Sequence, residues 1–388
     1  MLSKENLYYI KTKYPEIAII APPLDSIPTR SGNAIYTLVE QIARFSAKPI
    51  LLFSVKPNSN SLKSIISERI VYYPKEVKRS FIQRILGYRI TKRIFGHYNI
   101  HYYPYYKACY QICRRVGIKL VLQEESIEAL NLKYKFQGKI ILHIHAITRP
   151  EAWQKIKNNI CEIVFVSRTS REIHNKGHEK FNSKVILNGI DLNLFRIQKS
   201  GEKRSIITFL FAGRMSHSKG LLQLCRAFSS ITNPKVRLLI IGDPHYQTDD
   251  GFLNEFHRLI HRDSRINFIG PISNEHISDY YNLSDFVVCP SIGQEGLPKV
   301  ISESLVMGIP VITSDRGGIR ELINNNFNGL IIEEPVCEVT IKAMLESAIE
   351  KHYQLCQNAV TDAQRVRNVL SLEKMVNEYD KLFNQHLK

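Results

Sequence analysis

The sequence predicts an α/β protein of two halves, each a parallel sheet covered by helices, and three observations support this prediction. The chain has 388 residues, which is more than one ordinary hydrophobic core holds. Apolar strands alternate with amphipathic helices, the order of elements that parallel sheets require. This alternation restarts after a polar connection at 198–203. We therefore expect domains at 1–195 and 196–365, and a C-terminal helix at 366–388 that packs back on the first domain.

Composition favours a globular protein with reduced thiols. Hydrophobic residues make up 44% of the chain and charged residues 23%, which are globular values. No apolar run approaches the roughly 18 residues that cross a bilayer, and the N-terminus lacks the apolar core of a signal peptide. The seven cysteines are scattered without a zinc-binding spacing. We expect a cytoplasmic location.

The positive charge is concentrated in the first half. Residues 1–195 hold 31 Lys+Arg and 14 Asp+Glu, whereas residues 196–388 hold 22 of each, so the net charge of +17 lies in the first half. This asymmetry indicates an anionic partner, such as nucleic acid, a phospholipid surface or a phosphorylated glycolipid. In the stretch 75–110, basic and large apolar residues are mixed and tyrosines follow, as in interfacial membrane segments. Two ordinary helices are the alternative.

The first half opens with the strand 17–21, a loop that contains Gly32, and a helix with apolar residues on one face between 35 and 42. A glycine loop between a strand and a helix presents unpaired N–H groups and the positive end of the helix dipole, which bind anions. A simple turn at Gly32 is the alternative. Further strands are expected at 50–53, 119–122, 139–142, 162–167 and 185–187.

Two histidines follow the strand at 139–142. We expect His143 and His145 to point to opposite sides, so they are not predicted to form a metal pair. Because α/β folds bind ligands at the C-terminal ends of strands, one of them is a candidate site residue. A structural histidine is the alternative.

The second half begins with the strand 206–211, the loop 213–220 and the helix 221–228. Arg214 and Lys219 lie in this loop, beside the helix N-terminus. The loop lacks the glycine spacing and the ending of a Walker loop, but a guanidinium fork and an ammonium point charge suit a pair of phosphates. Later strands are expected at 236–241, 265–269, 285–289 and 310–313, and the chain is helical by composition from about residue 340.

The stretch 290–303 combines a glycine loop with two carboxylates. Pro298 fits the first turn of a short helix, where its missing N–H has no cost. Glu295 precedes this helix and Glu303 projects from it. The helix-end amides would bind phosphate and the two carboxylates would bind hydroxyls, so together they would bind a sugar nucleotide. The alternative is an ordinary Gly-Pro loop with surface glutamates.

Several motifs together resemble one family. They are Gly213-Arg214 with Lys219-Gly220, Gly270, Glu295-Gly296-Leu297-Pro298 with Glu303, Gly308-Ile309-Pro310-Val311-Ile312, Asn188-Gly189-Ile190-Asp191 and His145. The set closely resembles the retaining glycosyltransferases of family 4, and especially bacterial members that extend lipopolysaccharide core oligosaccharide. The resemblance implies the GT-B fold, in which two Rossmann-like domains face each other across a cleft.

The resemblance also implies roles for individual residues. Arg214 and Lys219 would bind the donor diphosphate, Glu295 the hydroxyls of the donor sugar, and Glu303 the ribose hydroxyls. His145 would lie near the donor sugar, and we group it with Glu295, Arg214 and Lys219 as the catalytic set.

The remaining donor contacts implied by the resemblance involve the backbone. The amides of Gly296 and Leu297 would contact the donor, Ile269 and Gly270 the base, and Gly32 the diphosphate. One departure is Ser31-Gly32, where the family often has two adjacent glycines. A serine Cβ restricts the backbone, which puts the contact at Ser31 in doubt but not that at Gly32.

The implied reaction transfers a hexose or N-acetylhexosamine from a nucleotide diphosphate sugar, with UDP the expected carrier, to a glycan or glycolipid acceptor. The anomeric configuration is kept. No cofactor and no metal are predicted, because the chain lacks an Asp-x-Asp pair and protein cations would stabilise the leaving group. Peripheral attachment to the inner face of the cytoplasmic membrane, through its anionic surface, is a hypothesis.

Other functions compete with this interpretation. A nucleotide-sugar epimerase could share the fold but has little need of a basic first half. A phosphorylase would need a pyridoxal lysine, which no signal marks. A nucleic-acid-binding protein would explain the basic charge, but the chain contains no recognised nucleic-acid module, so no nucleic-acid partner is predicted.

Overall fold

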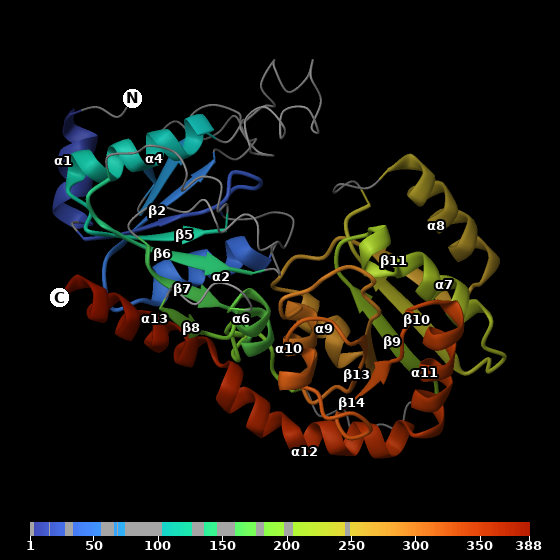
Figure 1. The fold of residues 1–388 in the computed structure, drawn as a ribbon. Helices are drawn as coiled ribbons and strands as arrows, with labels where there is room; N and C mark the ends of the chain where they lie inside the picture. The colour runs from blue at the N-terminus through green and yellow to red at the C-terminus, as the bar shows by residue number, and fades with distance from the viewer. Residues whose placement is uncertain are drawn as a thin grey trace. The chain divides into compact units, whose positions relative to one another are not determined.

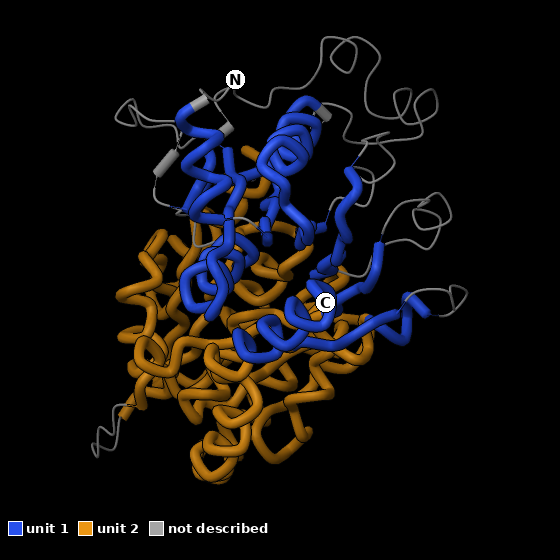
Figure 2. Tube along the Cα trace, turned by 90° about the vertical axis from the view of Figure 1, so that its left-hand side faces the viewer, with its two compact units in different colours: residues 1–165, 171–186, 375–388 blue, residues 166–170, 187–374 orange. Residues whose placement is uncertain are grey.

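The computed structural model describes residues 4–14, 16–27, 34–55, 66–67, 69–73, 103–125, 136–145, 160–175, 182–197, 205–244 and 249–388. The predicted site residue Gly32 and the basic stretch up to residue 102 lie outside these described residues. The chain forms two compact units (Figure 2). Unit 1 comprises Met1–Phe165, Arg171–Ile186 and Met375–Lys388, and unit 2 comprises Val166–Ser170 and Leu187–Lys374.

Unit 1 is built on an eight-stranded sheet in the order β3-β4-β2-β1-β5-β6-β7-β8 (Figure 1). All neighbours pair in parallel except β3 and β4. The strands are β1 (Ile17–Ile20), β2 (Ile50–Val55), β3 (Ile66–Ser67), β4 (Ile70–Tyr73), β5 (Leu120–Glu124), β6 (Lys139–Ile144), β7 (Ile160–Phe165) and β8 (Ser183–Val185). The helices are α1 (Lys4–Lys13), α2 (Ala34–Phe45), α4 (Tyr103–Val116), α6 (Arg168–Asn175) and α13 (Leu372–Leu387).

The sheet of unit 1 is apolar on both faces, as expected for parallel strands between helices. Every residue of β1 is buried. Ala18 and Ile20 join a core cluster that includes residues of α1 and α4. The buried residues of α2, from Tyr36 to Ala43, recur at the three- and four-residue spacing of an amphipathic helix.

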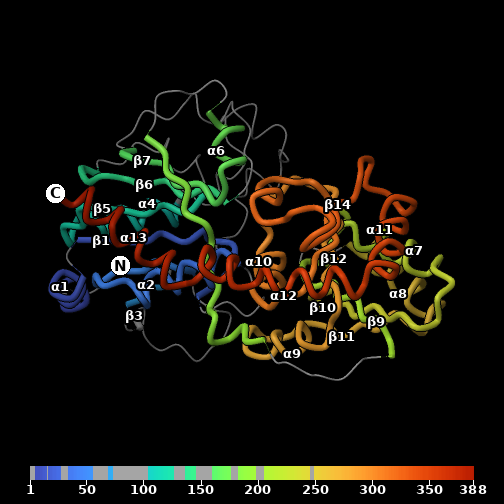
Figure 3. The backbone as a smooth tube through the Cα atoms, turned by 90° about the horizontal axis from the view of Figure 1, so that it is seen from below, coloured from blue at the N-terminus to red at the C-terminus, as the bar shows by residue number. Residues whose placement is uncertain are grey.

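Unit 2 is built on a six-stranded, fully parallel sheet in the order β11-β10-β9-β12-β13-β14. The strands are β9 (Ile207–Ala212), β10 (Val236–Ile241), β11 (Ile266–Gly270), β12 (Phe286–Cys289), β13 (Val311–Ser314) and β14 (Gly329–Ile332). The helices are α7 (Leu221–Ser229), α8 (Asp250–Arg262), α9 (Ile277–Asn282), α10 (Lys299–Val306), α11 (Glu338–Glu350) and α12 (His352–Leu370), with 3-10 turns at His217–Lys219 and Ile319–Glu321. The chain ends with α12 and α13 in succession (Figure 3).

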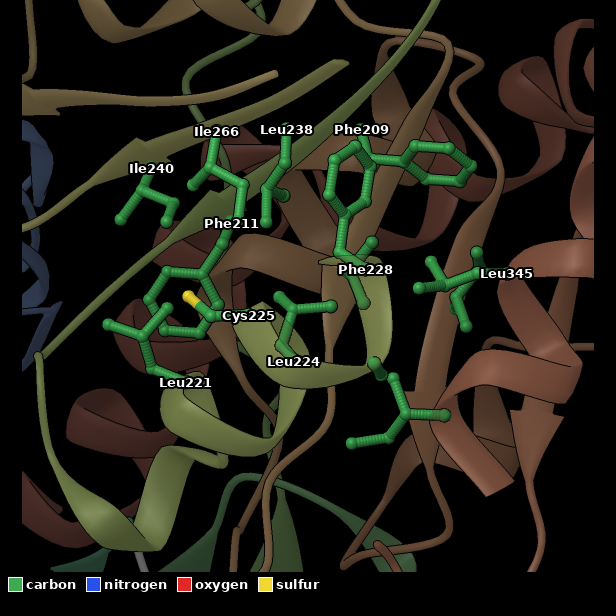
Figure 4. Packing of buried hydrophobic residues seen from close by; sticks show 14 of the residues in the cluster. Phe209, Phe211, Leu221, Leu224, Cys225, Phe228, Leu238, Ile240, Ile266 and Leu345 are labelled. Atoms are coloured by element: carbon green, nitrogen blue, oxygen red, sulfur yellow. The ribbon is translucent and has the colours of Figure 1, made fainter. Parts of the chain in front are cut away.

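Helices cover both faces of this second sheet. Alternate residues of β9 face opposite ways, so Phe209 joins a cluster with α7, α8 and α11, and Leu210 joins a cluster with α9, α10 and α12. Figure 4 shows the first cluster, in which Phe228 of α7 lies beside Phe209. The two phenylalanine rings are 6.1 Å apart, edge to face. The predicted α/β architecture with two parallel sheets is confirmed.

The strand order of unit 2 locates a ligand site. Numbered within the unit, it is 3-2-1-4-5-6, the doubly wound order of Rossmann folds. The direction of winding reverses between β9 and β12. Ligands of such sheets bind beyond the C-terminal ends of the strands at this switch point. The loops at 213–220 and 290–298 follow β9 and β12 directly, so two of the predicted motifs lie at the switch point.

Candidate functional site

The loops after β9 and β12 are joined by backbone hydrogen bonds. The N–H groups of Ile292 and Gly293 donate to the carbonyl of Ser218, at 2.8 and 2.9 Å. Gly220 has a φ of +69°, and a Cβ there would lie 2.2 Å from the Pro290 carbonyl oxygen. Only glycine lets the two loops approach this closely. The two motifs therefore form one assembly.

The structure brings Lys219 and Glu295 together. The Lys219 Nζ lies 2.5 Å from Glu295 Oε1, and the two side chains are only 16% and 14% exposed. The Ser291 hydroxyl donates to the same oxygen at 2.7 Å. A cation and an anion held side by side at a switch point suit a ligand that carries both phosphates and hydroxyls. Ser291 was not anticipated, because its role depends on the folded loop.

A third loop, after β13, supports the backbone around Glu295. The Gly318 N–H donates to the Gly296 carbonyl at 2.6 Å. Gly317 has a φ of +59°, and a Cβ there would lie 2.2 Å from the carbonyl oxygen of Glu295 and 2.3 Å from that of Gly296. The sequence shows the Gly317-Gly318 pair, but only the fold shows what it touches.

Glu303 is buried in α10 between two partners. The Tyr281 hydroxyl donates to its Oε2 at 2.7 Å, and Lys299 Nζ lies 3.1 Å from its Oε1. Burial, and then the nearby Glu303 carboxylate, raise the pKa of Tyr281 well above its usual value. The four-residue spacing from Lys299 to Glu303 is a signal for this ion pair that sequence reasoning missed.

The ends of β9, β10 and β11 present the other predicted donor contacts. The Gly213 N–H donates to the Ile241 carbonyl at 3.0 Å, and the Gly242 N–H donates to the Gly270 carbonyl at 3.1 Å. These bonds hold the loop with Arg214 beside the strand end with Ile269 and Gly270. Arg214 is exposed, and no described residue pairs with its guanidinium. It remains available for an anion.

In unit 1, His143 and His145 meet at one carboxylate, so the expectation that they point to opposite sides is wrong. Nδ1 of His143 lies 3.1 Å from Glu124 Oε2, and Nε2 of His145 lies 2.6 Å from the same oxygen. The ring centroids are 4.0 Å apart. Side chains two residues apart along a strand lie on the same face, so the spacing of His143 and His145 itself places both on one side.

Glu124 is fully buried at the C-terminal end of β5 and stays ionised. Burial acts to raise the pKa of its carboxyl, but His143 and His145 outweigh burial and hold that pKa at about 2. In the register of the sheet, Glu124 is the partner of His143. In the sequence, the signal that could have identified Glu124 is an acidic residue at the end of an apolar strand. Its pairing with both histidines required the sheet order.

Comparison with solved structures defines the class of the fold. The Anabaena protein HepE in complex with UDP superposes with a TM-score of 0.72 at 17% identity, over 95% of this chain and 100% of that chain. Sucrose-phosphate synthase from Thermosynechococcus elongatus gives 0.71 at 19% identity, over 95% and 98%. With its two parallel-sheet units, the chain has the GT-B fold.

Comparison of sequences adds a family match for part of the chain and a curated relative. Residues 194–366 match the family model described as Glycosyl transferases group 1. The curated lipopolysaccharide 1,2-N-acetylglucosaminetransferase of Salmonella typhimurium is 22% identical over 375 residues, which cover 89% of this chain and 92% of that protein. The family match covers the second part of the chain, and the similarity to the Salmonella protein extends over most of both chains.

Proposed function

We propose that this chain is a retaining glycosyltransferase of the family 4 type. It transfers a hexose or N-acetylhexosamine from a UDP-sugar to a lipid-linked or lipopolysaccharide glycan. The observation that carries the proposal is the Lys219–Glu295 pair at the switch point of unit 2. A phosphate-binding cation beside a hydroxyl-binding carboxylate matches the two ends of a diphosphate sugar.

The chemistry that these residues perform is the stabilisation of leaving-group charge. When the bond between the sugar and the diphosphate breaks, negative charge grows on the phosphate oxygens. Lys219 and the exposed Arg214 supply positive charge there, and the backbone amides at the start of α10 add hydrogen-bond donors. Glu295 orients the sugar through its hydroxyls. Glu303, which Tyr281 and Lys299 hold in place, binds the ribose.

The choice of donor and acceptor rests on the relatives. The HepE structure contains UDP, and the Salmonella relative is named for transfer of N-acetylglucosamine to lipopolysaccharide. The excess of Lys and Arg in residues 1–195 favours an anionic acceptor at a membrane surface. No helix in the described part of the chain is both long and apolar enough to cross a bilayer. We propose peripheral binding at the cytoplasmic face.

The proposal is tested by a donor-hydrolysis screen with UDP-, GDP- and ADP-sugars. We expect turnover with a UDP-sugar and a loss of about 100-fold or more in Lys219→Ala and Arg214→Ala. Lys342→Ala is the matched control, because Lys342 forms an exposed pair with Glu346 on α11 of the same unit. Turnover that is unchanged in Lys219→Ala and Arg214→Ala would refute the site. NMR of the product's anomeric proton tests whether the anomeric configuration is retained. Inversion would refute the proposal that the enzyme is a retaining one.

A further inference from the structure

A chain of buried hydrogen bonds in unit 1 runs from the C-terminal helix to His145. The Tyr379 hydroxyl of α13 lies 3.1 Å from both ring nitrogens of His143. His143 contacts Glu124, which contacts His145. Tyr379, His143 and Glu124 are fully or almost fully buried, and His145 is 8% exposed. The only member near solvent is therefore the predicted site residue.

The chemistry of Glu124 fixes the tautomer of His145. An ionised carboxylate only accepts hydrogen bonds, so Nε2 of His145 must carry the proton that it shares with Glu124. No described residue bonds to Nδ1 of His145. Glu124 therefore holds the ring in one orientation and leaves Nδ1 as the nitrogen without a partner among the described residues.

The spacing of the polar atoms favours a hydrogen-bonded network over a metal centre. Among the described residues, Glu124, His143 and His145 are the group whose possible ligand atoms lie together, all within 4.8 Å. Two ligands on one Zn²⁺ at about 2.0–2.2 Å are separated by about 3 Å or more. The 2.6 Å between Glu124 Oε2 and His145 Nε2 is shorter than that, and lies near the short end of the range for a charge-assisted hydrogen bond.

We propose that Glu124 is a positioning residue for sugar transfer, which sets the tautomer and orientation of His145, with His143 and Tyr379 holding Glu124 in turn. This inference rests on the proposed function, because His145 needs a donor sugar on which to act. It gives the C-terminal helix a role in the site. Tyr379 belongs to a segment more than 230 residues away from His143 in the sequence, and its hydroxyl lies beside the His143 ring that contacts Glu124.

The test compares Glu124→Gln with Glu162→Gln. Glu162 is a matched control, because its Oε2 also lies 2.6 Å from the Nε2 of a histidine, His386, and both partners are about 10% exposed or less. If the Glu124–His145 pair were only structural, kcat should change by the same factor in Glu124→Gln and in Glu162→Gln. Circular dichroism verifies folding, and Tyr379→Phe is the milder second variant.

We expect Glu124→Gln to lower kcat by about 10- to 100-fold, the range for loss of a hydrogen bond to a charged group. KM should stay within about twofold, because His145 would act in the transition state. Tyr379→Phe should lower kcat less, and Glu162→Gln should leave it unchanged. In histidine-¹⁵N-labelled protein, the low-field Nε2 proton of His145 should vanish in Glu124→Gln and persist in Glu162→Gln.

Three results would overturn the inference: wild-type kcat in Glu124→Gln, an equal loss in Glu162→Gln, or a His145 signal that persists without Glu124. Stoichiometric Zn²⁺ binding that Glu124→Gln abolishes would also overturn it, in favour of a metal centre. A wild-type protein that turns over no donor would refute the proposed function and the catalytic role together. The NMR signal would still decide the tautomer, so the two failures are distinguishable.

Discussion

Replacing Glu295 with glutamine separates phosphate binding from sugar binding. Glu295 holds Lys219 at 2.5 Å in a largely buried pair. A diphosphate that binds Lys219 must compete with this carboxylate. Glutamine keeps the size of the side chain and removes the charge, so Lys219 becomes freer to bind phosphate. We expect Glu295→Gln to bind free UDP more tightly than the wild type.

The size of the effect follows from the ion pair. A charge-assisted hydrogen bond between partly buried groups contributes about 1–2 kcal/mol, so the dissociation constant of UDP should fall by about 5- to 30-fold. For a UDP-sugar the gain is offset, because charged hydrogen bonds to the sugar hydroxyls, worth about 1.5–3 kcal/mol, are lost. UDP-sugar binding should stay equal or weaken. The preference for the sugar-bearing ligand should thus fall by about 10- to 100-fold.

Isothermal titration calorimetry measures both ligands with the wild type and the variant. Glu346→Gln serves as the control, because Glu346 pairs with Lys342 at 3.3 Å in an exposed position and should change neither constant. UDP binding by Glu295→Gln that equals or falls below that of the wild type would refute the competition. A parallel gain for UDP and the UDP-sugar would refute the role of Glu295 in sugar binding.

Three further predictions concern the support of the site. Gly317→Ala should lower the unfolding free energy by about 2–4 kcal/mol in a urea titration, because a Cβ at φ +59° would meet the Glu295 and Gly296 carbonyls. The control is Gly117→Ala, at φ +85° with no atom within 4 Å, which should lower the unfolding free energy by only about 1–2 kcal/mol. Equal losses in the two variants would contradict the contact at Gly317. Tyr281→Phe should lower the unfolding free energy by about 1–3 kcal/mol in the same titration, because Glu303 loses its buried hydrogen-bond donor. An unchanged unfolding free energy would show that the Glu303 carboxylate accepts a hydrogen bond from another donor. The pKa of Glu124 is depressed to about 2 in the folded state, so its contribution to stability is full above about pH 4.5 and is lost as pH falls toward 2. Between pH 5 and 3, the thermal midpoint of Glu124→Gln should therefore fall less than that of the wild type. An equal fall in the two proteins would contradict the depressed pKa.

Sequence reasoning could find residues whose role is set by their place after a strand. Arg214 and Glu295 lie in loops that directly follow apolar strands, and parallel sheets gather such loops at one edge. Lys219 and Glu295 are 76 positions apart, yet both could be assigned to one site. Their direct ion pair could not be, because it depends on side-chain conformations inside the folded loops.

Residues that act from a distant element could not be predicted. Tyr281 reaches Glu303 from α9, and Tyr379 reaches His143 from the last helix. Nothing in the local pattern of either tyrosine distinguishes it from a core aromatic residue. The short strand β14, Gly329–Ile332, was also not anticipated, because its extended conformation depends on pairing with β13. The prediction that the two histidines point to opposite sides was wrong for a different reason, since side chains two residues apart on a strand share a face.

A crystal structure of the protein soaked with a UDP-sugar tests the central claim most directly. We predict diphosphate density within hydrogen-bond distance of Lys219 Nζ and the Arg214 guanidinium, with sugar hydroxyls on the Glu295 carboxylate. Nucleotide density elsewhere, with the Lys219–Glu295 pair intact, would contradict the account.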